Sequence, residues 1–488
     1  MKIIRVTYIA LATLFSVASC SKEATEPDVY DWNNGEIYIR TSLSDVVSTR
    51  GKDMTLDRLK SFQVTCFNSA DREDQDGILS PYFENVTFNR KVNSAISIYE
   101  SAPEEGPLNW PIKSGVMSFF AFSPSIEEMR ADNTAIKDLD DDEINAYFKL
   151  INTTEIIEVD EENKSDISIG YRIGKVRINP DISRQFDFIT AEAAGERMKD
   201  FAGGVDLAFS HKLCQVELKA WGASQNYNFD IAGVRIGNPV VEGTFVFADD
   251  KDVSSSGRWE TDEESVKDKV EYLYSSKDNT DTEEHAGDII FRINNREHHS
   301  QEDAASIMGI GGCAMVLPTV NSKWEGLDDP NIGIEHYKTD RMYFSILMRV
   351  ADSESGKVVY PYPDNSTGMT VENYAVDHTG TIIRRLYPGE SPGTYFIDPE
   401  LQQPYEENEG VEILDFGWAA VPVDADWSAG KKYVYTLDYS EGIGIHDPAD
   451  PEPGKLIVGQ VPIEWSVSVS DWESAEKDEN YDPDLDVP

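Results

Sequence analysis

The sequence predicts an all-β fold of antiparallel β-sandwiches, because apolar residues recur with a period of two and helical spacing is scarce. The alternating segments are short, rich in β-branched and aromatic residues, and bounded by Gly, Pro, Asn and Asp. Many short strands separated by turn signals are typical of sandwiches. A mixed acidic stretch at 129–157 is where a short helix could form. Alternation is clearest at 37–43, 62–66, 116–122, 205–209, 214–218, 244–246, 344–350, 433–437 and 463–469.

The length of 488 residues predicts more than one domain. We place a boundary near residue 220, because one strand pair ends around 210–212 and a new alternation begins at Asn226. We therefore expect an N-terminal β-sandwich at 51–220 and a C-terminal β-sandwich at 221–472. Long polar insertions at 249–288 and 362–414 are expected to be surface loops, and the acidic tail at 473–488 is expected to be disordered.

The net charge of −47 excludes a nucleic-acid partner, since a phosphate backbone requires clustered Lys and Arg. We interpret the acidic runs as a solvated exterior, with a weak divalent-cation site as the alternative. No stretch after the first twenty residues is apolar for 18 positions, so we expect no membrane-spanning helix there.

The first fifty residues predict a lipid anchor. Lys2 and Arg5 precede an apolar stretch at 9–17, and the segment closes with Val-Ala-Ser before Cys20. Small residues before a Cys are typical of a lipoprotein signal peptide, here 1–19, whose Cys receives diacylglycerol and fatty acyl chains such as palmitate. Several acyl chains give stable attachment, so we expect an outer-membrane, surface-exposed protein with a lipid-anchored leader at 20–50. The alternative is an ordinary secretory peptide that contains a Cys.

The remaining cysteines, Cys66, Cys214 and Cys313, are widely spaced and form no CxxC pair. We expect neither metal binding nor redox chemistry from them. Cys66 and Cys214 lie in alternating segments and are interpreted as small buried hydrophobes. The sequence leaves open whether two of the three form a disulfide.

Several short motifs follow one another in order along the chain. They are TRG at 49–51, LKSFQV at 59–64, YFENV at 82–86, WP at 110–111, VMSFFAFSP at 116–124, LAFSHKL at 207–213, MVLP at 315–318, GKKYVYTL at 430–437 and VSVSDW at 467–472. Together these motifs resemble the fimbrillin-like family, which comprises the type V pilus subunits and accessory lipoproteins of Gram-negative anaerobes. The resemblance implies two tandem sandwich domains of a transthyretin-like, Greek-key type.

The resemblance implies assembly into a pilus, or fimbrium, by strand exchange. In this family a trypsin-like protease cuts after an Arg downstream of the anchor, and here the match is Arg50 followed by Gly51. The strand that leaves would carry Ile37, Ile39 and Leu43, and a strand from another pilus subunit would fill the groove. Alternatively, Arg50 is an ordinary loop residue and the first strand stays.

The resemblance also implies that a chain-forming subunit donates a strand, often from its C-terminal segment. The tail after Trp472 is a poor donor, because its large apolar residues are only Tyr481, Leu485 and Val487. This composition and the long insertions favour an accessory role at the tip or anchor over a shaft role.

No catalytic motif is present: GxSxG, HExxH, P-loop and Rossmann patterns are all missing from the sequence. We therefore expect no enzyme activity and no cofactor. His298 and His299 are the best metal candidates, but adjacent side chains on a strand point to opposite faces, so we predict no metal site. We expect His211 to be a hydrogen-bonded structural residue.

A second class of function stays open, namely a surface lipoprotein that binds glycans or a host protein in cell adhesion and never polymerises. Trp259, Trp324 and Trp418 lie in or near the insertions of the second half and could form a sugar platform. We favour a core or hydrophobic-lid position for each of them.

Overall fold

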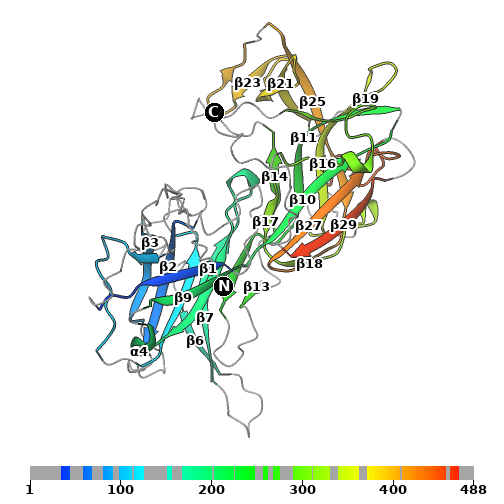
Figure 1. Cartoon of the computed structure of the whole chain (residues 1–488). Helices are drawn as coiled ribbons and strands as arrows, with labels where there is room; N and C mark the ends of the chain where they lie inside the picture. Colours follow the sequence, from blue (N-terminus) through cyan, green and yellow to red (C-terminus); the bar gives the residue numbers. More distant parts are fainter. Residues whose placement is uncertain are drawn as a thin grey trace, which may run out of the picture.

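The computed structural model shows two bodies arranged end to end, a barrel and a larger sandwich (Figure 1). The all-β prediction is confirmed: nearly every element is a strand. The structure describes residues 35–43, 59–68, 81–91, 98–112, 115–125, 151–156, 167–200, 203–224, 226–247, 257–261, 267–274, 289–309, 312–329, 339–361, 371–406, 409–457 and 462–471.

The first body is a ring of seven strands in the order β1-β4-β3-β2-β5-β8-β9. Most neighbours are antiparallel, whereas β1 and β9 run parallel. The interior is filled by a cluster of buried apolar residues that includes Phe62, Val64, Phe119 and Phe209. The strands are β1 (Ile39–Leu43), β2 (Ser61–Asn68), β3 (Phe83–Arg90), β4 (Ile98–Ser101), β5 (Met117–Ser123), β8 (Ile189–Gly195) and β9 (Val205–His211).

The second body is a sandwich of two sheets that enclose the largest core cluster. One sheet contains β10 (Cys214–Trp221), β16 (Ala305–Ser306), β17 (Ala314–Val316), β27 (Lys431–Asp438) and β29 (Glu464–Asp471). The other contains β11 (Tyr227–Gly237), β14 (Val270–Leu273), β15 (Phe291–Ile293), β19 (Tyr343–Asp352), β20 (Val358–Tyr360), β21 (Val371–Asp377), β22 (Ile382–Pro388), β23 (Tyr395–Asp398), β24 (Gln403–Pro404), β25 (Val411–Pro422) and β28 (Ile445–His446).

Two smaller sheets and four short helices complete the described part. The sheets are formed by β6 (Ile151–Ile156), β7 (Ile167–Arg177), β12 (Glu242–Val246) and β13 (Arg258–Glu260), and by β18 (Thr319–Asn321) with β26 (Ala425–Trp427). The helices are η2 (Ile182–Arg184), α4 (Arg197–Asp200), η3 (Gln301–Asp303) and η4 (Gly326–Asp328).

Two sequence interpretations need correction. Residues 151–156 form strand β6, not part of a helix, because they pair with β7 along six residue pairs; 129–150 lie outside the described residues. The stretch 362–414 is not simply a surface loop, because β21 pairs with β25 and β22 to β24 continue that sheet outward. Short alternating segments within this polar stretch therefore form strands that extend the sheet.

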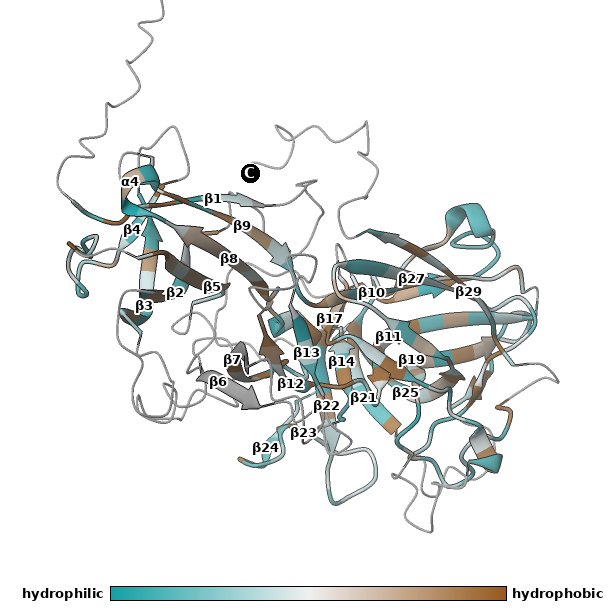
Figure 2. Ribbon diagram, turned by 90° about the horizontal axis from the view of Figure 1, so that it is seen from below, coloured by the Kyte–Doolittle hydropathy of each residue, from teal (hydrophilic) through white to brown (hydrophobic). Residues whose placement is uncertain are grey.

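The two bodies meet at a junction rich in aromatic residues, which Figure 2 shows as hydrophobic segments between the barrel and the sandwich. Phe120 and Phe122 of β5 belong to one buried cluster with Phe188, Phe245 and Leu317. The chain itself crosses at 212–213, because β10 already belongs to the sandwich. This crossing precedes the boundary predicted near residue 220 by one strand.

Polar contacts stabilise the segment at 211–213, where the chain passes from the barrel to the sandwich. His211 Nδ1 lies 2.8 Å from Asp187 Oδ2, and both side chains are buried, which confirms His211 as a hydrogen-bonded structural residue. Trp259 Nε1 donates to the Lys212 carbonyl at 2.6 Å. Lys212 is itself buried, with Nζ donating to Ser210 Oγ at 2.6 Å and lying 5.6 Å from the centre of the Phe245 ring.

Burial of Lys212 makes the stability of this junction depend on pH. Burial lowers the pKa of Lys212 to about 8, against a partial opposing effect of Glu192. Because the unfolded chain keeps the ordinary value near 10.5, it binds more protons than the folded chain between about pH 8 and 10.5. The contribution of Lys212 to the free energy of unfolding therefore rises with pH across that window, and its cost is greatest below pH 8.

We expect Lys212→Met to raise the free energy of unfolding at pH 7 by roughly 1–3 kcal/mol, since it removes a buried charge and keeps the apolar stem. Urea unfolding of both proteins at pH 7 and pH 10 measures this, and the gain should shrink at pH 10. An equal difference between the two proteins at both pH values would contradict the assignment.

Candidate strand-exchange site

Strand β1 closes the barrel. It lies between the first body's β4 and β9, pairing antiparallel with β4 over two residue pairs and parallel with β9 over five, from Ile39 opposite Val205 to Leu43 opposite Phe209. Figure 1 shows β1 lying beside β9. The predicted exchangeable segment is therefore a short strand that joins two longer parts of the barrel wall, and its removal would leave two unpaired backbone edges.

The side chains of this segment complete the barrel core. Ile37 and Ile39 are 2% and 0% exposed and belong to the same cluster as Phe62, Tyr99 and Phe209. The Phe62 ring centre lies 4.7 Å from that of Tyr99 and 5.1 Å from that of Phe209. Burial of two isoleucines contributes roughly 1.5–3 kcal/mol each. Loss of β1 would therefore expose the aromatic side chains of Phe62, Tyr99 and Phe209, which another apolar strand could cover.

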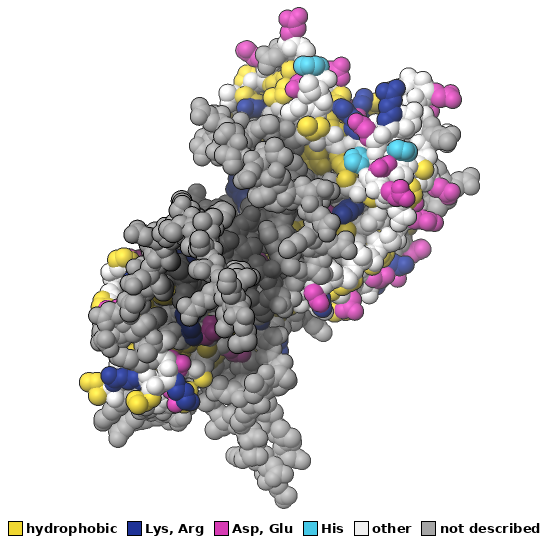
Figure 3. Space-filling view, viewed as in Figure 1, with side chains coloured by type: hydrophobic (Ala, Val, Ile, Leu, Met, Phe, Trp, Pro, Cys, Tyr) yellow, Lys and Arg dark blue, Asp and Glu magenta, His cyan; other side chains and the backbone are white. Residues whose placement is uncertain are grey.

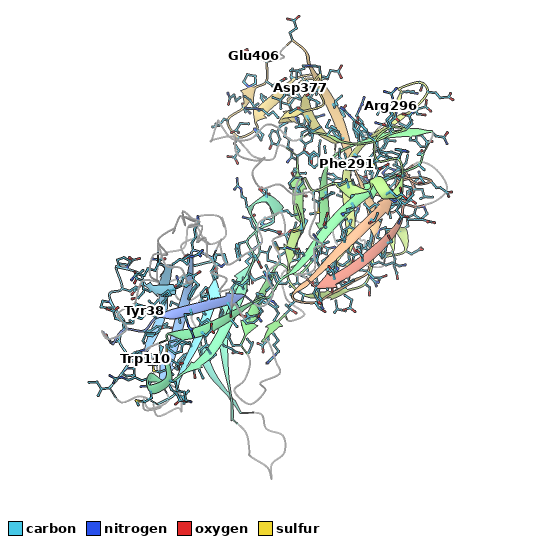
Figure 4. The ribbon with its side chains drawn as sticks, viewed as in Figure 1. Tyr38, Trp110, Phe291, Arg296, Asp377 and Glu406 are labelled. Carbon is cyan, nitrogen blue, oxygen red and sulfur yellow. The ribbon has the colours of Figure 1, made fainter. Side chains whose placement is uncertain are left out.

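Backbone contacts hold the start of β1 on both sides. The Ile37 N–H donates to the Leu108 carbonyl at 2.7 Å, and the Val205 N–H donates to the Tyr38 carbonyl at 2.9 Å. Gly204 has φ +72°, and a Cβ there would lie 3.0 Å from the Tyr38 carbonyl oxygen, so this close approach requires glycine. Figure 4 shows Tyr38 at this point of the barrel, where its hydroxyl donates to the Glu36 carboxylate.

The predicted lipidation and cleavage residues, Cys20, Arg50 and Gly51, lie outside the described residues. The described chain stops at Leu43 and resumes at Leu59. The structure therefore brings Ile37 and Ile39 together with the barrel core, while the lipid site and the cleavage site stay predictions.

Strand β29 has the features of a donor strand. Within the described part of the chain it pairs with β27 alone, over eight residue pairs, and Figure 1 shows it at the margin of its sheet. Val467 and Val469 are 43% and 56% exposed. In register they lie opposite Tyr435 and Tyr433, which are buried, so the apolar face of the sheet continues onto β29, where the two valines are only partly covered.

Alternation at 463–469 predicts a strand but does not identify a donor, since alternation alone does not separate a buried strand from an exposed one. The donor features are the exposed valines and the position at the edge of the sheet. Ile463, Trp465, Val467 and Val469 alternate as the segment from Ile37 to Leu43 does. Ile463 and Trp465 pack against the core of the sandwich, whereas Val467 and Val469 are exposed.

Other candidate residues are accounted for structurally. Trp324 and Trp418 are each 1% exposed, and Trp259 packs partly buried at the junction, so the expected core or lid positions are confirmed. His298 stacks on Phe291 with ring centres 4.2 Å apart, and His299 pairs with Asp303. Across the described ranges no three His, Cys, Asp or Glu residues gather as a metal site.

The described helices are all too short to cross a membrane. Of the described cysteines, Cys66 and Cys214 are buried as expected, and burial raises the pKa of the Cys214 thiol. All three described cysteines are free thiols.

A family comparison agrees with this architecture. A model of the fimbrillin-like family matches residues 49–294, which is half of the chain. The chain belongs to the fimbrillin-like family. The match begins one residue before Arg50, after β1, and runs from β2 to β15.

Solved structures similar to this fimbrillin-like protein have low sequence identity. A putative cell adhesion protein from Parabacteroides distasonis is 11% identical, with a TM-score of 0.36 over 90% of this chain and 99% of that one. The tip fimbrial protein Mfa3 from Porphyromonas gingivalis is 10% identical, with a TM-score of 0.30 over 90% of this chain and 100% of that one. The fimbrial anchor protein Mfa2 from the same organism is 12% identical, with a TM-score of 0.23 over 67% of this chain and 80% of that one. A search of curated proteins finds no match.

Proposed function

We propose that this fimbrillin-like protein is a cell-surface subunit of a fimbria, structural in role, that assembles by strand exchange at the β1 site. The observation that carries the proposal is the position of β1, which closes the barrel with only five residues, while Ile39 in the strand and Ile37 just before it are buried in the barrel core. Membership in the fimbrillin-like family supports the same role.

The proposed sequence of events begins with the precursor anchored through acylated Cys20 in the outer membrane. Cleavage after Arg50 then separates β1 from the rest of the chain, and β1 leaves the space between β4 and β9. A strand of a second subunit enters that space, pairs with both exposed edges and covers Phe62, Tyr99 and Phe209. The chain would carry both the acceptor site, which is the space left by β1, and a candidate donor strand, which is β29.

A donor strand within the chain favours a subunit that extends a fimbria over one that only ends it. The alternative of a glycan-binding lipoprotein gains no support from Trp324 and Trp418, because both side chains are buried and offer no platform to a sugar.

The proposal is tested by refilling the groove with peptides. We expect a chain that starts at Gly51 to bind a peptide of residues 35–45 and a peptide of residues 462–471, and to gain thermal stability with increasing peptide concentration. A 462–471 peptide with Val467→Asp should not bind, whereas one with Ser468→Asp, which changes the opposite face, should bind. Full stability of the chain that starts at Gly51, with no response to either peptide, would contradict strand exchange.

A further inference from the structure

Strand β29 is an edge strand without the features that usually protect one. Natural proteins shorten exposed edge strands, bend them with a bulge, or place charges and prolines on them. Strand β29 pairs with β27 over eight residue pairs without a register shift, and its stretch from Trp465 to Ser470 contains no charged residue and no proline. By contrast, β16 at the other edge of this sheet has two residues, and β24 at the edge of the second sheet contains Pro404.

The side chains of β29 are exposed on both faces of the strand. Val467 and Val469 are about half exposed. Ser466 and Ser468, which point to the opposite face, are exposed as well. Along the middle of the strand, a further strand therefore has access to the edge of β29 that lies away from β27.

The sequence of β29 is complementary to itself when two copies run antiparallel with a two-fold axis at Val467. The residues that lie opposite one another are then Val467 and Val467, Trp465 and Val469, Ser466 and Ser468, and Glu464 and Ser470. Every apolar side chain from Trp465 to Val469 faces an apolar one, and no acid faces an acid. Cross-strand pairs of this kind stabilise a sheet, whereas like charges directly opposite destabilise it.

Other ways of pairing two copies of β29 are less favourable. A parallel pair in register would place Glu464 of one copy beside Glu464 of the other. An antiparallel register shifted by one residue would place valines opposite serines. An axis at Ser468 would place Asp471 opposite Trp465. The sequence of the strand therefore selects the antiparallel register with its axis at Val467.

The charges around this edge favour the same orientation. The charged residues of β27 and β29 are Glu464 and Asp438 at one end, and Asp471, Lys431 and Lys432 at the other. Lys431 is paired with Asp471, and Lys432 Nζ lies 2.9 Å from Glu217 Oε2. A two-fold axis at Val467 places the end with two acids of each copy beside the end with two lysines of the other.

The overall charge opposes association of two copies. The net charge of each chain is −47, and further acids follow Asp471 in the sequence. Figure 3 shows acidic side chains over the described surface of the sandwich. Repulsion between exposed charges more than about 8 Å apart is largely screened at physiological ionic strength, whereas contacts between valines are not. Association through β29 should therefore strengthen with added salt.

We propose that two unprocessed copies of this chain pair antiparallel through their β29 strands, with a two-fold axis at Val467, and join their five-stranded sheets into one continuous sheet. The pairing needs neither cleavage after Arg50 nor strand exchange, so it goes beyond the proposed function. In the dimer β29 is occupied, and it becomes available as a donor only when the dimer dissociates.

The test uses the full chain with Cys20→Ser, in which β1 stays in place and no acyl chain contributes. We expect Val467→Cys to form a disulfide-linked dimer on mild oxidation, because directly opposite residues of an antiparallel pair have Cα atoms about 4.5–5.5 Å apart. Val469→Cys is the matched control, since it changes the same face of the strand but its two copies would lie more than about 13 Å apart. We expect at least roughly tenfold more linked dimer from Val467→Cys than from Val469→Cys. The Cys20→Ser chain without an added cysteine gives the background.

Sedimentation of the Cys20→Ser chain measures the same association without a crosslink. We expect a dimer that strengthens with added NaCl and that Val467→Asp abolishes, because two carboxylates would then meet at the axis. No linked dimer from Val467→Cys, equal yields from the two cysteine variants, or a monomer at every salt concentration would overturn the proposal. Failure of strand exchange would instead appear as a chain that starts at Gly51 and responds to neither peptide, and it would leave the dimer unchanged.

Discussion

Val467→Asp with Val469→Asp is expected to abolish end-to-end assembly while leaving the monomer folded. Both valines are about half exposed on β29, so two carboxylates there stay in contact with water in the monomer. In the assembled state the same positions would face Phe62, Tyr99 and Phe209 in the space between β4 and β9. An unpaired carboxylate buried there costs several kcal/mol, which is enough to prevent exchange.

The matched control is Ser466→Asp with Ser468→Asp, which adds the same charge to the same strand on its opposite face. We expect this control to assemble. Size-exclusion chromatography and electron microscopy of protein cleaved after Arg50 distinguish the two pairs. Assembly by the valine variant would exclude β29 as the donor.

Arg50→Ala is expected to stop assembly completely at an earlier step. Without a basic residue at this position a trypsin-like protease has no side chain to bind, so β1 stays covalently joined and keeps Ile37 and Ile39 in the core. The mass of the mature protein and the presence of fimbriae on cells measure this effect. We expect a chain that starts at acylated Cys20 and no polymer.

Gly51→Ala serves as the control for Arg50→Ala, because it changes the residue after the proposed cut and preserves the arginine. We expect normal cleavage and assembly for this control. Fimbriae formed by the Arg50→Ala protein would mean that the first strand leaves by another cut or does not leave at all.

Much of this architecture follows from the sequence because period-two alternation is a local property. The segments around Phe62, Val205 and Tyr433 were predicted as strands, and all three are strands. Of the segment that is predicted to leave, Ile39–Leu43 is a strand, and Ile37 and Ile39 are buried, while its departure stays a prediction. Alternation states that one face of a strand is apolar, and a folded chain usually covers that face.

What the sequence did not supply is non-local. The parallel pairing of β1 with β9 joins residues more than 160 positions apart, and no local pattern encodes that neighbour. Val467 and Val469 alternate just as buried residues do, so only their exposure in the folded chain distinguishes them.

The most direct test of strand exchange is the N-terminal residue and intact mass of this protein in fimbriae isolated from its own cells. The account predicts a chain that starts at Gly51, without acyl chains and without the strand that contains Ile37 and Ile39. A fimbrial protein that still starts at acylated Cys20 would contradict it, because the space between β4 and β9 would then remain filled by the chain's own strand.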